Sequence, residues 1–439
     1  MSELHGRNFL RALFHVGQRM LRTGVSDQLM DDAITALVDA AEILTAASEE
    51  AVLSVVRDAF YLDRKMLAHA STEFHSLLQA MKRRKIDSVT ITRGATRQDL
   101  ADLAALVVGK ASDLPAEGTI RINDRALAPS DLDIRPMSGL RKTYAESLDA
   151  LRGVKETRTL QLGEVLEVVD GFIAGSAADP GSSLIMATVH NHDEITYYHS
   201  VNVCLLSMAL GRFIGLTQDQ TRLLGLSALL HDIGRVVVDE VALQREGRLS
   251  NEDWAQVRLH PQEGALAIMA ASGPGQELAA AVALEHHVRM DGGGYPSLKG
   301  RRPALFSRMV AIVDAYDAIT SHRPYRPART PNEALRVLLD GAGTIHDADL
   351  LRLFIEMMGH YPPGSLLRIG SGEVVMVVPS DDDALSAVVV REPDGSPTPR
   401  PKATTITPAE IVAQLLPDEA GIDPGSLLEL VEQGEHAER

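Results

Sequence analysis

Residues 229–235 read Leu-Leu-His-Asp-Ile-Gly-Arg, and a later motif starts at His286-His287 and continues as Asp291-Gly-Gly-Gly-Tyr-Pro296. His231-Asp232 ends an apolar run from Leu223 to Leu230, so we expect an imidazole and a carboxylate at the end of a buried helix. Such mixed nitrogen and oxygen groups suit first-row transition metals. One His-Asp or His-His pair alone is weak support for a metal site.

Three further residues strengthen the metal hypothesis because they lie in apolar, helix-like stretches. His199 lies at the start of an amphipathic helix pattern that runs to about Gly215, His260 precedes Pro261 at a helix boundary, and Asp314 lies within an apolar helix. Taken singly, His260 or Asp314 is more often an ordinary polar residue. A charge in an apolar setting is costly, however, unless it is paired or bound to metal.

The candidate ligands are too many for one octahedral ion that must also leave a position for water. Neighbours on a helix point about 100° apart, so adjacent imidazoles suit two ions side by side. We therefore expect a dinuclear centre with Asp232 as the bridging carboxylate, of the kind that activates water for attack on phosphorus. A ligand set without thiolates favours iron or manganese, with zinc as an alternative. The set is His199, His231, Asp232, His260, His286, His287 and Asp314.

Composition restricts the class of protein. The chain has 439 residues, 45% hydrophobic and 23% charged, which is ordinary for a soluble globular protein. Its net charge of −17 argues against binding to a nucleic acid polymer or to anionic lipid. The single cysteine, Cys204, rules out an intramolecular disulfide and lies in an apolar run, where we expect burial. Neither a membrane-length apolar run nor a secretory signal is evident, so we expect a cytoplasmic protein without membrane insertion.

Hydrophobic spacing predicts a mainly α protein with five segments. Residues 1–138 are expected to form an α+β regulatory or dimerisation region, 139–178 a connecting helix, 179–360 an all-helical catalytic domain, 361–405 a small β appendage and 406–439 an acidic tail. A homodimer and signalling protein partners remain open for the first region.

Within these segments, particular runs predict particular elements. Helical spacing is expected over Asp31–Ala47 and Glu49–Leu67, in one long helix over Arg141–Ile173, and over Ala409–Leu416. Strands are expected at Ile86–Thr92, Thr119–Ile122, Leu366–Ile369, Glu373–Val378 and Ala387–Val390, the last three as a hairpin. Thr96 to Asp99 resembles a capping box before a helix.

The motifs occur in the order found in the HD-GYP family of cyclic di-GMP phosphodiesterases, a branch of the HD phosphohydrolases, and the chain closely resembles that family from about Asp193 to Asp347. The resemblance implies an all-helical catalytic domain whose metals are held by the seven residues above. It also implies that Arg323 and Arg326 hold substrate phosphate and that Tyr295 shapes the pocket lip. Asp317, in the Asp-Ala-Tyr-Asp motif, is expected to contact substrate. The matching motifs are Tyr198–Val203, His231–Gly234, Gly247–Ser250, His260–Gly264, His286-His287, Asp291–Pro296, Asp314–Thr320 and Arg323–Arg326.

Three positions depart from the family pattern. Arg235 stands where the family usually has Lys, Val288 where Glu usually follows the His pair, and Ile195 where members with a third metal have Glu. The last departure favours two metals. Arg235 lies four residues after His231 and three after Asp232, so these side chains share one helical face. Arginine is a planar fork and lysine a point charge, so we expect retained but altered turnover.

The sequence thus predicts a metal-dependent phosphodiesterase that opens cyclic di-GMP to linear pGpG by a metal-activated hydroxide. Asp232 and Arg235 are its expected catalytic residues. Further cleavage to GMP is left open, as is action on another nucleotide such as cyclic GMP-AMP or a mononucleotide. A catalytically weak or inactive domain acting as a cyclic-dinucleotide receptor or protein-interaction module is the alternative. The two unusual residues Arg235 and Val288 favour that alternative, and the complete ligand set argues against it.

Overall fold

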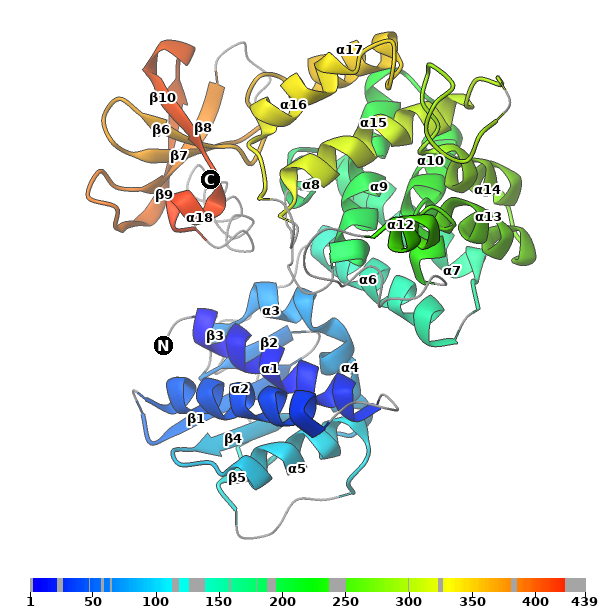
Figure 1. The fold of residues 1–439 in the computed structure, drawn as a ribbon. Coiled ribbons are helices and arrows are strands. Elements are labelled where there is room, and N and C mark those ends of the chain that lie inside the picture. Colours follow the sequence, from blue (N-terminus) through cyan, green and yellow to red (C-terminus); the bar gives the residue numbers. More distant parts are fainter. Residues whose placement is uncertain are drawn as a thin grey trace. The chain divides into compact units, whose positions relative to one another are not determined.

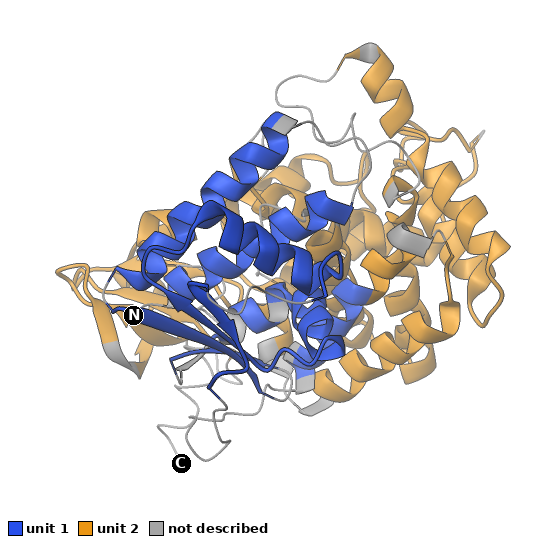
Figure 2. Cartoon of the chain, turned by 90° about the horizontal axis from the view of Figure 1, so that it is seen from below, with its two compact units in different colours: residues 1–149 blue, residues 150–439 orange. Residues whose placement is uncertain are grey.

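The computed structural model describes residues 3–21, 27–46, 48–56, 59–63, 65–112, 118–125, 139–157, 159–178, 180–187, 195–236, 250–298, 300–322, 327–379 and 385–422. The chain divides into two units, residues 1–149 and residues 150–439 (Figure 2). Figure 1 labels the helices and strands of both units.

Unit 1 combines helices with one antiparallel sheet. The strand order is β3-β2-β1-β4-β5. Its elements are α1 (Glu3–Leu21), α2 (Asp27–Thr45), β1 (Glu50–Val56), β2 (Ala59–Leu62), β3 (Lys65–Met66), α3 (Ala68–Glu73), α4 (His75–Arg83), β4 (Ser88–Thr92), α5 (Arg97–Val108) and β5 (Ile120–Ile122). α6 (Gly139–Thr157) crosses the boundary between the units.

The hydrophobic core of unit 1 takes alternate residues from the sheet. Ala51, Leu53 and Val55 of β1 pack in one cluster with apolar side chains of α1, α2 and α5. Side chains alternate between the two faces of a strand, so this cluster belongs to a single face of the sheet.

The helix predicted over Glu49–Leu67 is wrong, because this segment contains β1, β2 and β3. Apolar residues occur at nearly every position of β1, and all its interior residues are buried. Such a run satisfies a helical template and a strand template equally well, because a strand buried on both faces has no alternation. The β-branched Val52, Val55 and Val56 were the signal for a strand.

The remaining helix and strand predictions for unit 1 agree with the structure. The strand expected at Ile86–Thr92 is β4, and the one at Thr119–Ile122 is β5. Helix α5 begins with a capping box, in which Thr96 accepts from the amide of Asp99 and the Asp99 carboxylate accepts from the amide of Thr96. The helix expected over Asp31–Ala47 corresponds to α2.

The single helix predicted over Arg141–Ile173 is two helices, α6 and α7 (Leu162–Ala178). Helical spacing on both sides of a break looks continuous when each part is amphipathic. The boundary between the two units also falls within this stretch, at Asp149 and Ala150.

Unit 2 contains the helices that carry the candidate ligands. Helix α10 begins with a capping box between Thr217 and Gln220 and ends at His231, its C-cap residue. The elements of this part are α7, α8 (Pro180–Met186), α9 (Ile195–Phe213), α10 (Gln218–Leu230), η2 (Ile233–Val236), α12 (Asn251–Val257), α13 (His260–Ala270), α14 (Gln276–Glu285), α15 (Leu305–Thr320), α16 (Pro331–Asp340) and α17 (Ala348–Met358).

An antiparallel sheet of order β10-β6-β7-β8-β9 follows these helices. The three predicted strands correspond to β6 (Leu366–Ile369), β7 (Val374–Val377) and β8 (Leu385–Arg391). The predicted hairpin is only part of the sheet, because β9 (Pro397–Ile406) and β10 (Ile411–Leu415) extend it beyond residue 405. Short elements flank β10, namely η3 (Pro408–Glu410) and α18 (Pro417–Ala420).

The helix predicted over Ala409–Leu416 is wrong, because β10 occupies most of it and pairs with β6. Pairing with a strand more than forty residues earlier is a long-range contact that no local window contains. β9 was missed because of its prolines, Pro397, Pro399 and Pro401. Proline is tolerated there because β9 is an edge strand of its sheet.

None of the described helices is long and apolar enough to cross a membrane.

Candidate metal centre

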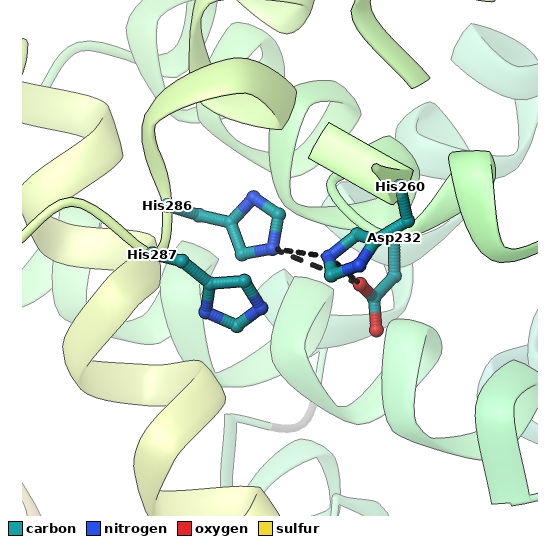
Figure 3. A group of neighbouring side chains, drawn as sticks. All are labelled: Asp232, His260, His286 and His287. Atoms are coloured by element: carbon teal, nitrogen blue, oxygen red, sulfur yellow. Dashed lines mark hydrogen bonds and ion pairs between the residues drawn. The ribbon is translucent and has the colours of Figure 1, made fainter. Parts of the chain in front are cut away.

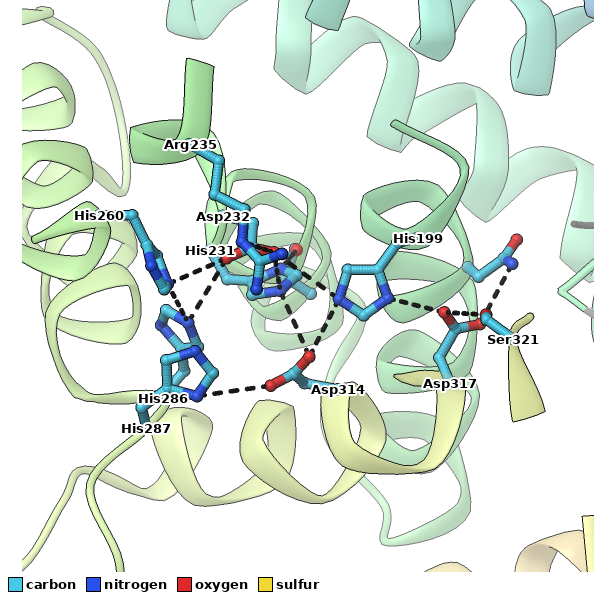
Figure 4. A network of polar contacts seen from close by, with 12 residues as sticks. His199, His231, Asp232, Arg235, His260, His286, His287, Asp314, Asp317 and Ser321 are labelled. Atoms are coloured by element: carbon cyan, nitrogen blue, oxygen red, sulfur yellow. Dashed lines mark hydrogen bonds and ion pairs between the residues drawn. The ribbon is translucent and has the colours of Figure 1, made fainter. Parts of the chain in front are cut away.

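Helix ends bring most of the candidate ligands together. His231 is the C-cap of α10, Asp232 follows it before η2, and His260 is the first residue of α13. His286 is the C-cap of α14, and His287 follows it. His199 lies within α9 and Asp314 within α15. Figure 4 shows these side chains, far apart in the sequence, pointing into one shared space.

The seven predicted ligands form two groups of potential metal donors. Asp232, His260, His286 and His287 make up the first group, drawn in Figure 3. The second group consists of His199, His231 and Asp314. Within each group the donor atoms lie within 4.8 Å of one another. The structure therefore brings together every ligand expected from the sequence.

Two carboxylates connect the groups. Oδ1 of Asp232 lies 3.1 Å from Nε2 of His260 in the first group, and its Oδ2 lies 3.6 Å from Nε2 of His231 in the second. Asp314 is arranged similarly, with Oδ1 2.9 Å from Nε2 of His199 and Oδ2 3.7 Å from Nδ1 of His287. The position of Asp232 suits the bridging role expected of it.

Main-chain carbonyls fix three of the imidazole rings. Nδ1 of His231, His260 and His286 each donates to the carbonyl oxygen three residues earlier, at 2.7, 2.6 and 2.8 Å. With Nδ1 protonated, Nε2 of each neutral ring carries a lone pair. Metal-binding histidines are commonly oriented by such a bond from the other ring nitrogen.

These lone pairs test whether the site suits a cation. Nε2 of His260 lies 3.2 Å from Nε2 of His286, so two lone pairs face each other. Nε2 of His231 is buried and has no hydrogen-bond partner among the described residues. Buried polar atoms are normally satisfied, and a cation between these nitrogens would satisfy them. The donor set therefore fits divalent metal.

Burial sets the protonation of three of the histidines. It lowers the pKa of His231 to about 4 and that of His287 well below the usual value. It also lowers the pKa of His260. Neutral imidazoles are the form that binds metal.

The two carboxylates remain ionised. Burial alone would raise the pKa of Asp232, but the charge of Arg235 and the neighbouring histidines hold it well below its usual range. Burial alone would also raise the pKa of Asp314, but the hydrogen bond with His199 holds it well below the usual value.

Two glycines permit close approaches at the site. A Cβ on Gly234 would lie 2.0 Å from the carbonyl oxygen of His260, so only glycine lets η2 pack against the start of α13. Gly294 has φ +80°, and a Cβ there would lie 2.1 Å from the carbonyl oxygen of His287. The second contact folds the Gly-Tyr-Pro loop back onto the histidine pair.

Tyr295 forms one wall of the site. Its ring centroid lies 4.7 Å from that of His287 and 6.2 Å from that of His260. Burial raises the pKa of its hydroxyl, so the side chain stays neutral. His287 and Arg235 are the more exposed of these groups, with side chains 21% and 16% accessible, whereas His231 is inaccessible. The site is thus open on the side of His287 and Arg235.

Arg235 lies against the candidate bridging carboxylate. Its Nε is 2.8 Å from Oδ2 of Asp232. A partly accessible guanidinium at this position can approach a ligand while its Nε side contacts Asp232.

Asp317 occupies a different position from the one expected. It is 1% exposed, and its Oδ2 accepts from Nδ1 of His199 at 2.7 Å. The amide of Asn202 and the hydroxyl of Ser321 also donate to its carboxylate, at 3.1 and 3.2 Å. Asp317 thus lies behind His199, and the substrate contact expected from the sequence is corrected to a positioning role.

Glu285 was missed in the sequence. Its Oε2 accepts from the amide of Ala304 and from the hydroxyl of Ser307, both at 2.8 Å. Since Glu285 ends α14 and Ala304 is the N-cap of α15, this carboxylate joins the helix before the histidine pair to the helix that carries Asp314. The available signal was a Glu immediately before the pair in a chain that has Val288 immediately after it.

Two predicted phosphate contacts, Arg323 and Arg326, lie outside the described residues. Their roles remain those implied by the resemblance.

Comparison with known proteins gives a consistent family. Residues 184–350 match the HD domain family. The chain is 35% identical over 238 residues to a cyclic di-GMP phosphodiesterase of Pseudomonas aeruginosa, covering 54% of this chain and 57% of that protein. It is 33% identical to the cyclic di-GMP phosphodiesterase response regulator RpfG of Xanthomonas campestris, over 30% of this chain and 36% of that protein.

A third relative has a different named substrate. A 3′3′-cGAMP-specific phosphodiesterase of Vibrio cholerae is 32% identical, covering 36% of this chain and 36% of that protein. The matches span between about a third and somewhat over half of these relatives' lengths. Residues 184–350 therefore carry an HD domain, and the ordered motifs and these relatives support the HD-GYP branch for that domain.

Proposed function

We propose that this protein is a metal-dependent phosphodiesterase that hydrolyses a cyclic dinucleotide, with cyclic di-GMP as substrate and linear pGpG as product. The observation that carries the proposal is the pair of donor groups connected by Asp232 and Asp314. Dinuclear centres of this kind are suited to in-line displacement at phosphorus.

The seven candidate ligands would hold two divalent cations, iron or manganese with zinc as an alternative. When bound, the cations would supply an activated water and neutralise charge on the phosphate. The water oxygen bonds to phosphorus while the bond to the 3′ oxygen breaks and that oxygen gains a proton. Our proposal gives Asp232 the bridging role between the two donor groups.

Arg235 and Tyr295 would act on the substrate itself. The guanidinium of Arg235, partly accessible beside Asp232, would contact a phosphoryl oxygen and stabilise its developing charge. The ring of Tyr295 would border the pocket and limit the entry of water beside His287.

The names of the relatives support the substrate class. Two are named for cyclic di-GMP and one for 3′3′-cGAMP. The shared chemistry is a ring of two nucleotides joined by two phosphodiesters. Cyclic di-GMP is our choice, and the cGAMP relative makes a panel of both substrates necessary.

The test uses the full chain, loaded anaerobically with Fe²⁺ or Mn²⁺ and incubated with cyclic di-GMP or 3′3′-cGAMP. Chromatography should detect linear pGpG and show whether GMP follows. His231→Ala should abolish turnover, and His360→Ala, a change at an exposed histidine, should retain it. Absence of linear product from protein of verified metal content would overturn the proposal. Binding without turnover would instead identify a receptor.

A further inference from the structure

Arg258 lies over the ring of Tyr295, which borders the site. It is the C-cap residue of α12, exposed, and two residues before the candidate ligand His260. Its guanidinium carbon lies 5.6 Å from the ring centroid of Tyr295. An arginine within about 6 Å of an aromatic centroid is attracted by the π-electrons of the ring.

Tyr295 links this guanidinium to the metal centre. The same ring lies 4.7 Å from the ring of His287, a member of the first donor group. The guanidinium carbon therefore lies no farther from the ring centroid of His287 than the 5.6 Å and 4.7 Å separations added together. That places a positive charge beside the centre without making it part of the ligand set.

The charge of Arg258 is not matched by a carboxylate within 4 Å among the described residues. Three other arginines of this part of unit 2 differ in this respect. Arg289 pairs with Asp291 at 2.5 Å and Arg302 with Asp347 at 2.8 Å, while Arg235 contacts Asp232. Arg258 is thus an exposed cation that an aromatic ring holds in place and that is available to an anion.

The proposed substrate has a second anionic group to match. A cyclic dinucleotide contains two phosphodiesters, and hydrolysis takes place at one of them at a time. The uncleaved phosphodiester must remain outside the metal centre while its partner reacts. Guanidinium groups bind phosphate oxygens with two parallel hydrogen bonds, which fixes orientation as well as position.

We propose that Arg258, supported by the ring of Tyr295, binds the uncleaved phosphodiester of the cyclic dinucleotide. This inference rests on the proposed function, because it needs a substrate with two phosphodiesters. It makes Arg258 a substrate-binding residue that selects for cyclic dinucleotides over simple phosphodiesters.

The experiment compares two substrates, cyclic di-GMP and bis(4-nitrophenyl) phosphate, which has a single phosphodiester. Arg258→Ala should lower kcat/KM about tenfold more for cyclic di-GMP than for the single diester, mainly through KM, since a charge-assisted hydrogen bond is lost. Arg258→Lys keeps the positive charge and should recover part of that difference. Arg336→Ala removes an exposed cation from α16 and is the matched control.

Direct binding separates the two possible failures. Calorimetry of metal-loaded wild type and Arg258→Ala with cyclic di-GMP should give about tenfold weaker binding for the variant. Equal binding and equal kinetics overturn the Arg258 inference alone. Equal losses with both substrates also overturn it, because Arg258 would then merely support Tyr295. A wild type that neither binds nor cleaves cyclic di-GMP overturns the proposed function as well.

Discussion

Asp317 lies directly behind His199, with its Oδ2 2.7 Å from Nδ1 of the ring. The opposite ring nitrogen, Nε2, faces Asp314 at 2.9 Å and Asp232 at 3.7 Å. Since the carboxylate can only accept at Nδ1, it orients the ring and increases the basicity of Nε2. Asp317 therefore connects to the donor groups through His199.

Asp317→Asn should weaken metal binding about 10–100-fold without unfolding the protein, as expected for an outer partner of a metal ligand. The measurement is a metal titration monitored by calorimetry. Ser321→Ala is the matched control, because it removes one donor to Asp317 and leaves the carboxylate and His199 in place. Unchanged metal affinity in Asp317→Asn would contradict the positioning role.

Arg235→Ala should lower kcat for cyclic di-GMP on the order of 100-fold, because an electrostatic contact to the developing charge is removed. Arg235→Lys should retain turnover at an altered rate, since lysine keeps the charge but not the planar fork that contacts Asp232. Steady-state kinetics of both variants provide the measurement. If neither changes the kinetics, Arg235 has no catalytic role.

Metal binding should release protons in a pH-dependent way. Burial opposes protonation of His199, but hydrogen bonds to Asp314 and Asp317 outweigh it and raise its pKa to about 9. The pKa values of His231, His260 and His287 are lowered, so those rings are already neutral. Metal must displace the proton of His199 at neutral pH, whereas above pH 9 that proton is already gone.

We expect chelated protein to release about one proton per chain on metal loading at pH 7.5 and progressively fewer as the pH rises through 9. Apparent metal affinity should rise over the same range. Calorimetry in buffers of different ionisation enthalpy measures the number of protons released per chain. A release that does not vary between pH 7 and 10 would show that His199 is not the proton donor.

Glu285→Ala should reduce the free energy of unfolding by about 1–3 kcal/mol, because the amide of Ala304 and the hydroxyl of Ser307 lose their acceptor. Ser307→Ala removes one of the two bonds and should cost less, about 1 kcal/mol. Glu285→Gln keeps an acceptor oxygen and should recover much of the loss. Denaturant titrations give the free energies of unfolding. If all three variants are as stable as the wild type, Glu285 does not link α14 to α15.

Local pattern was sufficient to find the candidate ligands but not their arrangement. His231, His260 and His286 each follow an apolar helical run or begin a helix, and each ring is anchored to a carbonyl three residues earlier. This contact between a ring and a nearby carbonyl is local, and it repeats at all three histidines. The division into two groups depends on how α9, α10 and α15 pack, which no short window of sequence contains.

Asp317 and Glu285 show what sequence reasoning could not predict at the site itself. Both are acidic residues close to ligand motifs, and sequence reasoning assigned a substrate contact to Asp317 and no role to Glu285. Their partners lie far away in sequence, with His199 separated from Asp317 by 118 positions and Ser307 from Glu285 by 22. The same limit explains β10, whose partner β6 lies far upstream.

Removal of metal should destabilise unit 2. A ligand that binds only the folded state, at a free concentration about 100 times its Kd, stabilises that state by about 2.7 kcal/mol for each site. For a domain of this size we expect the unfolding temperature to rise about 5–10 °C per occupied site. The anchored nitrogens of His231, His260 and His286 are the reason to expect binding to the folded state, since in the unfolded chain these rings no longer converge.

Differential scanning calorimetry of chelated and Mn²⁺-loaded protein makes this comparison. His231→Ala removes a buried donor and should lose most of the metal-dependent rise, while His360→Ala should keep it. Because each variant is compared with its own chelated form, a general loss of stability in His231→Ala does not affect the result. Identical unfolding temperatures for chelated and loaded wild type, with loading verified by elemental analysis, would mean that the two donor groups do not bind metal in the folded protein.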